Sequence, residues 1–204
     1  LDSEILPFTI TGSDPVIVIS DISRPHRLHG SELKIKNAKT YINQLKQLGV
    51  IVDRKNRLLF IDNLVKNEIL NNDFTPDLST QLLNELTDLV ESPLLVTGCF
   101  DETFLELPPE VLSTVMKVHQ RYIPLYKVNV EFDPLSLDSK NTLLPTFLCI
   151  SNGLPSAKEK IIKGNEKVLK ARFADASFFI KSDLLISSSS RINKLKDVTF
   201  TEGL

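Results

Sequence analysis

Residues 105 to 126 read LELPPEVLSTVMKVHQRYIPLY, and the pattern of apolar residues changes in the middle of this stretch. Pro108 and Pro109 favour the start of a helix, because proline is well placed in a first helical turn. From Arg121 to Val130 the pattern is instead typical of a strand. The stretch therefore predicts a helix followed directly by a strand, and the inward face of that helix is expected to consist of Val111, Leu112, Val115 and Met116.

Other strands are predicted on both sides of this stretch. Residues 5–20 favour two short strands, and residues 33–36 (LKIK) favour another. Residues 94–100 (LLVTGCF) and 146–151 form apolar runs of the kind found in buried strands. The polar residues 133–141 are predicted to be a hairpin loop that precedes the last of these strands.

Amphipathic helices are predicted between the strands. Asn37 and Gly49 mark the start and the end of the first helix, and Asp53 is a suitable cap for the second. A third helix is predicted between residues 76 and 93, with its apolar stripe on one face. Strands and helices do not alternate regularly, so we expect an α+β fold with mixed or antiparallel sheet elements.

The last part of the chain is also predicted to be helical. Helical spacing covers residues 156–179 and 190–196, with interruptions at Gly164 and at the serine run 187–190. We expect residues 1–204 to be one fragment of a longer protein, with a helical sub-region at 37–92 inserted between strand-rich parts. No internal repeat is visible.

The composition indicates an ordinary globular protein. Its hydrophobic fraction is 42% and its formal net charge is −2, so the net charge of the whole chain does not indicate a class of binding partner. Cys99 and Cys149 lie in apolar stretches without CxxC spacing, which favours two reduced core thiols and a cytoplasmic compartment. No apolar run approaches the roughly 20 residues that a membrane-spanning helix needs, and we expect no membrane association.

The segment from His119 to Tyr122 combines the most chemically versatile side chains. His119 lies three residues after Met116, so on an α-helix it would share the buried face and serve as a structural histidine. Arg121 could hold an RNA phosphate or a carboxylate of this chain, and the sequence leaves both open. Gln120 lies between them and is a further candidate contact.

Two other polar segments are candidate contacts. The loop with Arg24, His26 and Arg27 is interpreted as a solvated loop or as a small basic surface for RNA phosphates. Asn165 follows Gly164, which is expected to permit a turn or a close helix approach. Arg172 is three residues before Asp175, a spacing at which ion pairs form on helices. Residues 158–204 carry 10 Lys and Arg against 6 Asp and Glu, so this end is the better candidate for an acidic partner.

Three segments, taken in order, resemble the beta subunit of the heterotetrameric glycyl-tRNA synthetase, a family that also occurs as a fused alpha-beta chain. Leu105–Tyr126 is similar to that family's LELPPEVL…M…HQRYFPV. Residues 143–152 (LLPTFLCISN) resemble LLPxFIxVxN, and residues 164–179 (GNEKVLKARFADASFF) resemble GNExVLRARLxDAxFF. Weaker matches at residues 6–8, 25–28, 38–57 and 191–204 extend the resemblance over nearly the whole chain.

The chain departs from the family pattern at a few positions. Pro25 stands where the family usually has glycine, and proline removes an N–H donor and fixes φ. Leu28 replaces phenylalanine. Ile123 replaces phenylalanine and Phe173 replaces leucine, and these last two changes keep the apolar character.

The resemblance implies that the chain is part of a glycine–tRNA ligase, which attaches glycine to tRNA-Gly with ATP. Glycine activation with ATP and Mg²⁺ would belong to the alpha subunit, so we expect no catalytic, cofactor-binding or metal-binding residue here. The implied partners are tRNA-Gly, the alpha subunit or domain, and other beta-subunit domains. We expect a non-catalytic module for tRNA contact or subunit assembly. The alternatives are an editing-type hydrolase that acts on misacylated tRNA and a purely structural spacer.

Overall fold

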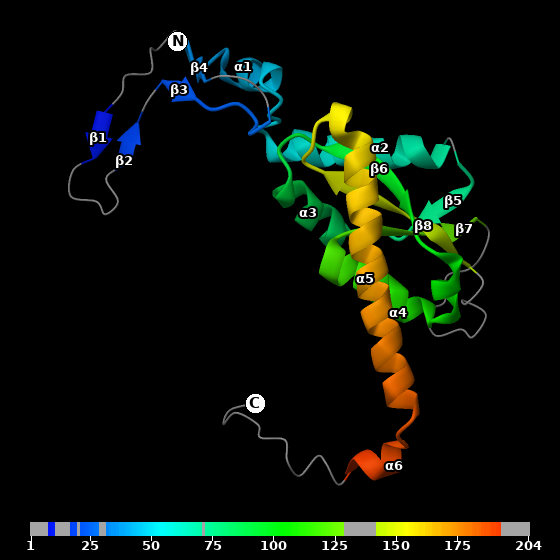
Figure 1. Cartoon of the computed structure of the whole chain (residues 1–204). Coiled ribbons are helices and arrows are strands. Elements are labelled where there is room, and N and C mark those ends of the chain that lie inside the picture. Colours follow the sequence, from blue (N-terminus) through cyan, green and yellow to red (C-terminus); the bar gives the residue numbers. More distant parts are fainter. Residues whose placement is uncertain are drawn as a thin grey trace.

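The computed structural model describes residues 8–10, 17–19, 21–28, 32–70, 72–128 and 142–192 of the chain, the first two ranges by their backbone only. Helices and antiparallel strands are mixed in it, as Figure 1 shows, so the expected α+β class is confirmed. None of the helices among the described residues combines the length and the apolar character that crossing a membrane requires.

A four-stranded antiparallel sheet forms the centre of the structure. Its strands are β5 (Phe74–Pro76), β7 (Ile123–Lys127), β8 (Leu143–Ser151) and β6 (Leu94–Cys99), in this spatial order. The predicted strands near residues 94, 121 and 146 are confirmed, and β7 and β8 pair as a hairpin. The predicted loop between them, at residues 133–141, lies outside the described residues. Strand β5 was not predicted, because polar residues precede it and its pairing with β7 is a long-range contact.

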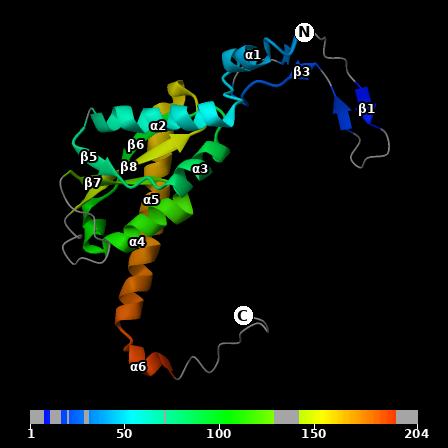
Figure 2. The same cartoon turned by 180° about the vertical axis from the view of Figure 1, so that it is seen from behind.

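Helices cover both faces of this sheet (Figure 2). Alternate residues of β8 point to opposite faces, so Phe147 and Cys149 enter one apolar core while Leu148 and Ile150 enter the other. The first core is completed by α4 (Pro109–Thr114), the π-helix Val115–Gln120 and α5 (Lys158–Leu184). The second is completed by α2 (Arg54–Leu70) and α3 (Thr80–Leu89).

The starts of the first three helices test the predicted caps. Helix α1 (Tyr41–Gln47) begins later than predicted, because Asn37 accepts the N–H of Thr40 in a turn that precedes the helix. Its end is confirmed, since Gly49 has the left-handed φ of 79° that glycine allows. Asp53 caps α2 as predicted and accepts the N–H of Asn56. Helix α3 is capped by Ser79, two to three residues after the start predicted near Pro76 and Asp77.

One of the two predicted interruptions in the last helical part is present. Helix α5 runs without a break through Gly164, so the expected turn at this glycine is wrong. The interruption at the serine run is confirmed, because α5 ends at Leu184 and Ser187 caps a separate helix, α6 (Ser188–Arg191), through its hydroxyl. The remaining predicted helical residues 193–196 lie outside the described residues.

The N-terminal part consists of short elements that precede α2. The two predicted strands are β1 (Phe8–Ile10) and β2 (Ile17–Ile19), which pair with each other. The predicted LKIK strand is β4 (Leu33–Lys34), and its partner β3 (Ile22–Ser23) was not predicted. The buried side chains of this part that the structure describes are His26, Ile35 and Leu45.

Candidate nucleic-acid interface

The π-helix Val115–Gln120 decides where His119 points. Met116 is fully buried, but His119 is exposed, so the prediction that the two share a buried face is wrong. A π-helix bonds each residue to the fifth one along instead of the fourth, so its turns are wider and the third residue after Met116 rotates away from the core. Gln120 is half-buried at the end of this helix.

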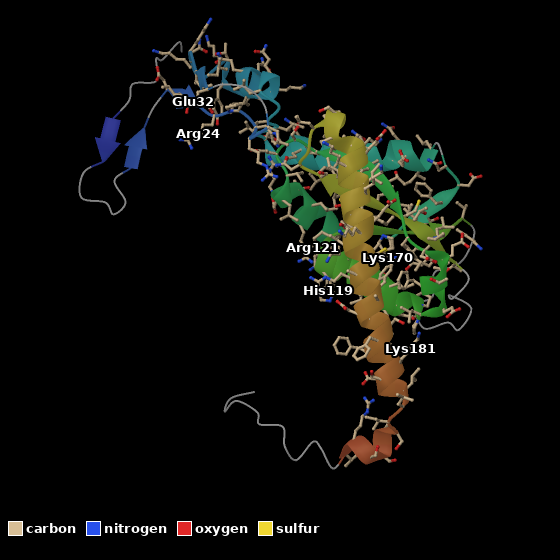
Figure 3. All side chains as sticks on the ribbon, viewed as in Figure 1. Arg24, Glu32, His119, Arg121, Lys170 and Lys181 are labelled. Carbon is tan, nitrogen blue, oxygen red and sulfur yellow. The ribbon has the colours of Figure 1, made fainter. Side chains whose placement is uncertain are left out.

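Arg121 follows the π-helix and is held by an acid of the same chain. Its φ of 58° lies in the left-handed region, which turns the chain from the helix into β7. The guanidinium Nε lies 2.5 Å from the Glu85 carboxylate on α3. Of the two interpretations that the sequence left open, the intramolecular ion pair is therefore present, and Figure 3 shows Arg121 beside the exposed His119.

A groove lies next to this ion pair. Its volume is about 290 Å³, and α3 and the π-helix form its walls. The ammonium of Lys117 at its edge lies 2.5 Å from the Asp77 carboxylate. The groove is thus lined by charges that already have partners, and its lining residues are Ser79, Gln81, Leu82, Glu85, Lys117, Val118 and Arg121.

The N-terminal loop brings its three candidates into different surroundings. Arg24 is exposed and lies 3.6 Å from Glu32. His26 is completely buried, with Nε2 3.9 Å from the Glu91 carboxylate, so this side chain cannot contact an RNA. The predicted basic surface is therefore incomplete. The backbone N–H of His26 donates to the Leu48 carbonyl at the end of α1, which ties the loop to this helix. Arg27 is exposed.

The inward face of α5 attaches the helix to the sheet. Leu169 and Phe173 are completely buried in the first core. The Asn165 amide donates to Sγ of Cys149 at 3.3 Å, and the Glu166 carboxylate accepts the N–H of Cys99. Asn165 is therefore a half-buried packing residue on the sheet side of α5.

The opposite face of α5 carries a row of lysines. The spacings between Lys160, Lys163, Lys167 and Lys170 are three, four and three residues, so their side chains share one face of the helix. All four are exposed, and none lies within ion-pair distance of a carboxylate among the described residues, although the Asp101 carboxylate interacts electrostatically with Lys170 at longer range. We call these four residues the lysine face; Lys170 is labelled in Figure 3.

The net charge of the C-terminal region did not predict the lysine face, because a summed charge does not report where side chains lie around a helix. The signal that could have found it is the period of the lysines themselves. Arg172 is exposed on another side of α5, and the ion pair expected with Asp175 is absent, so its guanidinium stays available. Of the eight sequence candidates, the structure thus brings only His119, Gln120 and Arg121 together.

Gly164 lies on α5 between two of these lysines. A Cβ built on this glycine would meet no atom within 4 Å, so nothing inside the described part of the chain requires a glycine here. Glycine inside a helix costs about 0.5–1 kcal/mol relative to alanine and often marks close approach of a ligand to the backbone. The bare backbone at Gly164 therefore points outward, next to Lys160, Lys163 and Lys167.

The cysteines are poorly suited to nucleophilic chemistry. Both thiols are free, but Cys99 is exposed, so the expectation of two core thiols holds for Cys149 only. Burial raises the pKa of Cys149 to about 12, and burial also raises the pKa of Cys99. Neither thiol is thus a ready thiolate near neutral pH. Among the described residues, no group of three or more His, Cys, Asp and Glu side chains could hold a metal ion.

Comparison with known proteins gives one consistent result. The family described as the glycyl-tRNA synthetase beta subunit matches residues 1–204. The glycine–tRNA ligase beta subunit of Trichodesmium erythraeum is 42% identical, with 100% of this chain and 28% of that protein covered. The corresponding subunits of a Synechocystis species and of Bacillus subtilis are 38% and 35% identical, covering 100% and 98% of this chain. The chain spans only 27–28% of the length of these relatives.

Proposed function

Because the chain belongs to the glycyl-tRNA synthetase beta subunit family, we propose that it is a non-catalytic module of a glycine–tRNA ligase that contacts tRNA-Gly. The observation that carries this proposal is the lysine face of α5, whose four ammonium groups are exposed and without ion pairs among the described residues. The lysine face extends from Lys160 to Lys170, or about 15 Å along the helix axis. A row of this length can follow several phosphates of an RNA strand.

The physical basis of the contact is electrostatic. Each lysine that neutralises a phosphate releases a condensed counterion, and this release favours binding at low salt. The Glu166 carboxylate does not compete for these lysines, because it faces the sheet and accepts a backbone N–H there. At Gly164, the missing side chain leaves room for a ribose or phosphate to reach the helix backbone.

The proposal places the chemistry of the ligase elsewhere. The relatives are named beta subunits, which supports an alpha subunit or domain as the partner that activates glycine with ATP and Mg²⁺. Hydrolysis of misacylated tRNA is not part of the proposal. His119 does not line the groove beside Arg121, and the Arg121 guanidinium is already held by Glu85.

The test replaces the lysine face in the complete ligase, made from the full-length beta subunit and the alpha subunit. All four lysines (Lys160, Lys163, Lys167 and Lys170) are changed to Ala. The matched control changes four exposed lysines elsewhere, Lys36, Lys46, Lys55 and Lys127, and so alters the net charge equally. Binding of tRNA-Gly is measured over a series of salt concentrations, and glycine-dependent ATP–pyrophosphate exchange is measured without tRNA.

We expect the lysine-face variant to bind tRNA-Gly more weakly, with a plot of log K against log salt that is less steep by about 3. The exchange reaction should be unchanged, because it involves no tRNA. The control variant should keep a nearly normal salt dependence. Equal salt dependence in both variants would reject the tRNA contact and leave the module as a structural spacer.

A further inference from the structure

The C-terminal end of α5 exposes large apolar side chains. Phe178 and Phe179 are 66% and 65% exposed, and Leu184 and Leu185, where the helix ends, are 82% and 86% exposed. We call these four residues the α5 tip. Figures 1 and 2 both show this end of the helix extending beyond the sheet, toward α6.

The apolar residues of the α5 tip surround the helix instead of forming one stripe. Phe178 and Phe179 are consecutive, as are Leu184 and Leu185, and consecutive residues of an α-helix point about 100° apart. Ile180, between the two pairs, is directed at the first core. The polar residues Lys181, Ser182 and Asp183 lie between the two pairs, and Arg191 of α6 forms an ion pair with Asp183. The tip therefore presents two exposed apolar pairs separated by polar residues, and exposed apolar patches commonly mark a contact with another part of a protein.

We propose that the α5 tip is enclosed by the remaining part of the same beta-subunit polypeptide. The relatives are more than three times as long as this chain, since the chain covers 27–28% of their length. A further domain of that polypeptide would supply apolar side chains that pack around Phe178 and Phe179 on one turn and around the two leucines on the next. This inference rests on the proposed place of the chain in a longer beta subunit, but not on the proposed tRNA contact.

The size of the surface favours a covalently linked occupant over a separate protein. Four side chains of this size and exposure offer on the order of 500 Å². Stable interfaces between separate proteins bury roughly 800 Å² on each partner. A linked domain docks at a high effective concentration, so a smaller apolar patch is sufficient for it. An alpha subunit or a second copy of this chain would need a larger surface than the tip provides.

The experiment places the photo-crosslinking amino acid p-benzoylphenylalanine at Phe179 of the full-length beta subunit, assembled with its alpha subunit. The replacement keeps the phenyl ring of Phe179 and extends it by a benzoyl group, and the 65% exposure of this side chain leaves room for the group within these 204 residues. The matched control carries the same group at Lys163, on the exposed lysine face. Mixing isotopically labelled and unlabelled beta subunits separates crosslinks within one chain from crosslinks between two copies. Crosslinked peptides are then identified by mass spectrometry.

We expect position 179 to crosslink within one chain to beta-subunit peptides outside these 204 residues, and position 163 to give no such product. Crosslinks from position 179 to the alpha subunit, to a second beta copy or to peptides of these 204 residues would each overturn the proposal. The same holds if no crosslink forms.

Hydrogen exchange gives a second measurement. In the full-length beta subunit, Phe179→Asp should lower the exchange protection of residues 178–186 by roughly 10- to 100-fold, the effect of exposing one buried phenylalanine. Protection of β8 should not change, because its core does not include Phe179. An unchanged protection at residues 178–186 would show that the tip is not enclosed. Loss of tRNA binding by the lysine-face variant leaves both readouts unaffected, so the two proposals can fail separately.

Discussion

The same substitution, glycine to alanine, should have opposite effects on stability at two positions. A Cβ at Gly98 would lie 2.5 Å from the Phe147 ring, which is fully buried. That ring is stacked on Tyr122 with centroids 4.7 Å apart, so it has little room to move away. Overpacking of this kind costs about 1–3 kcal/mol. A Cβ at Gly164 meets nothing within 4 Å, and Gly164→Ala should stabilise α5 by about 0.5–1 kcal/mol.

Urea unfolding of the two variants, followed by circular dichroism, measures both changes. The midpoints should move in opposite directions, and the free energies of unfolding of the variants should differ by roughly 1.5–4 kcal/mol. The slope of free energy against urea should stay the same if the compactness of both states is unchanged. A destabilised Gly164→Ala variant together with a neutral Gly98→Ala variant would refute this reasoning. In the complete ligase, Gly164→Ala should also weaken tRNA-Gly binding although the protein is more stable.

Burial raises the pKa of Cys149 to about 12. A thiol reagent at pH 8 should therefore label Cys99 slowly and Cys149 only after denaturation. Prompt labelling of Cys149 in the native protein would contradict its packing. The bidentate hydrogen bond from Arg54 lowers the pKa of the Asp88 carboxyl below its usual value. The stabilisation by the Arg54–Asp88 pair is therefore fully present above the unfolded-state pKa of Asp88. It is lost as the pH falls through the lower folded-state pKa. Asp88→Asn should flatten the acid limb of a stability–pH profile, and an unaltered limb would count against the pair. Arg121→Gly and Arg121→Ala both lose the ion pair, but only glycine tolerates the positive φ at this position. The glycine variant should therefore have the higher urea midpoint, with a free energy of unfolding larger by about 1 kcal/mol. The reverse order would argue against the left-handed backbone.

Local patterns were sufficient to predict much of the fold. The central strands were visible as continuous apolar runs, because both faces of the sheet are covered and each strand is buried on both sides. Asp53 and Gly49 marked helix ends correctly, since a cap and a left-handed stop act within a few residues. Strand β5 was missed for the opposite reason. Its pairing with β7 depends on residues about 50 positions away, which no local pattern reports.

The candidate site was harder to predict than the fold. The burial of His119 follows from α-helical spacing, and the π-helix changes that spacing without a local sequence pattern that would predict it. His26 was interpreted as a surface residue, because a basic loop is usually solvated, but the fold buries it. The lysine face was overlooked because charge was summed over a region, while the arrangement depends on position around the helix.

The two carboxylates beside β6 have a consequence for the behaviour of the protein at high concentration. Strand β6 is an outer strand of the sheet, and an outer strand with open amides can recruit another chain and seed aggregation. Glu166 of α5 accepts the N–H of Cys99, and Glu68 of α2 accepts the hydroxyl of Thr97 on the same strand. An incoming strand would have to displace Glu166 from the Cys99 amide, and the Glu68 carboxylate adds a second negative charge close to the same strand. These acids therefore disfavour edge-to-edge association of the sheet. They lie on α5 and α2, the helices that also pack into its two apolar cores.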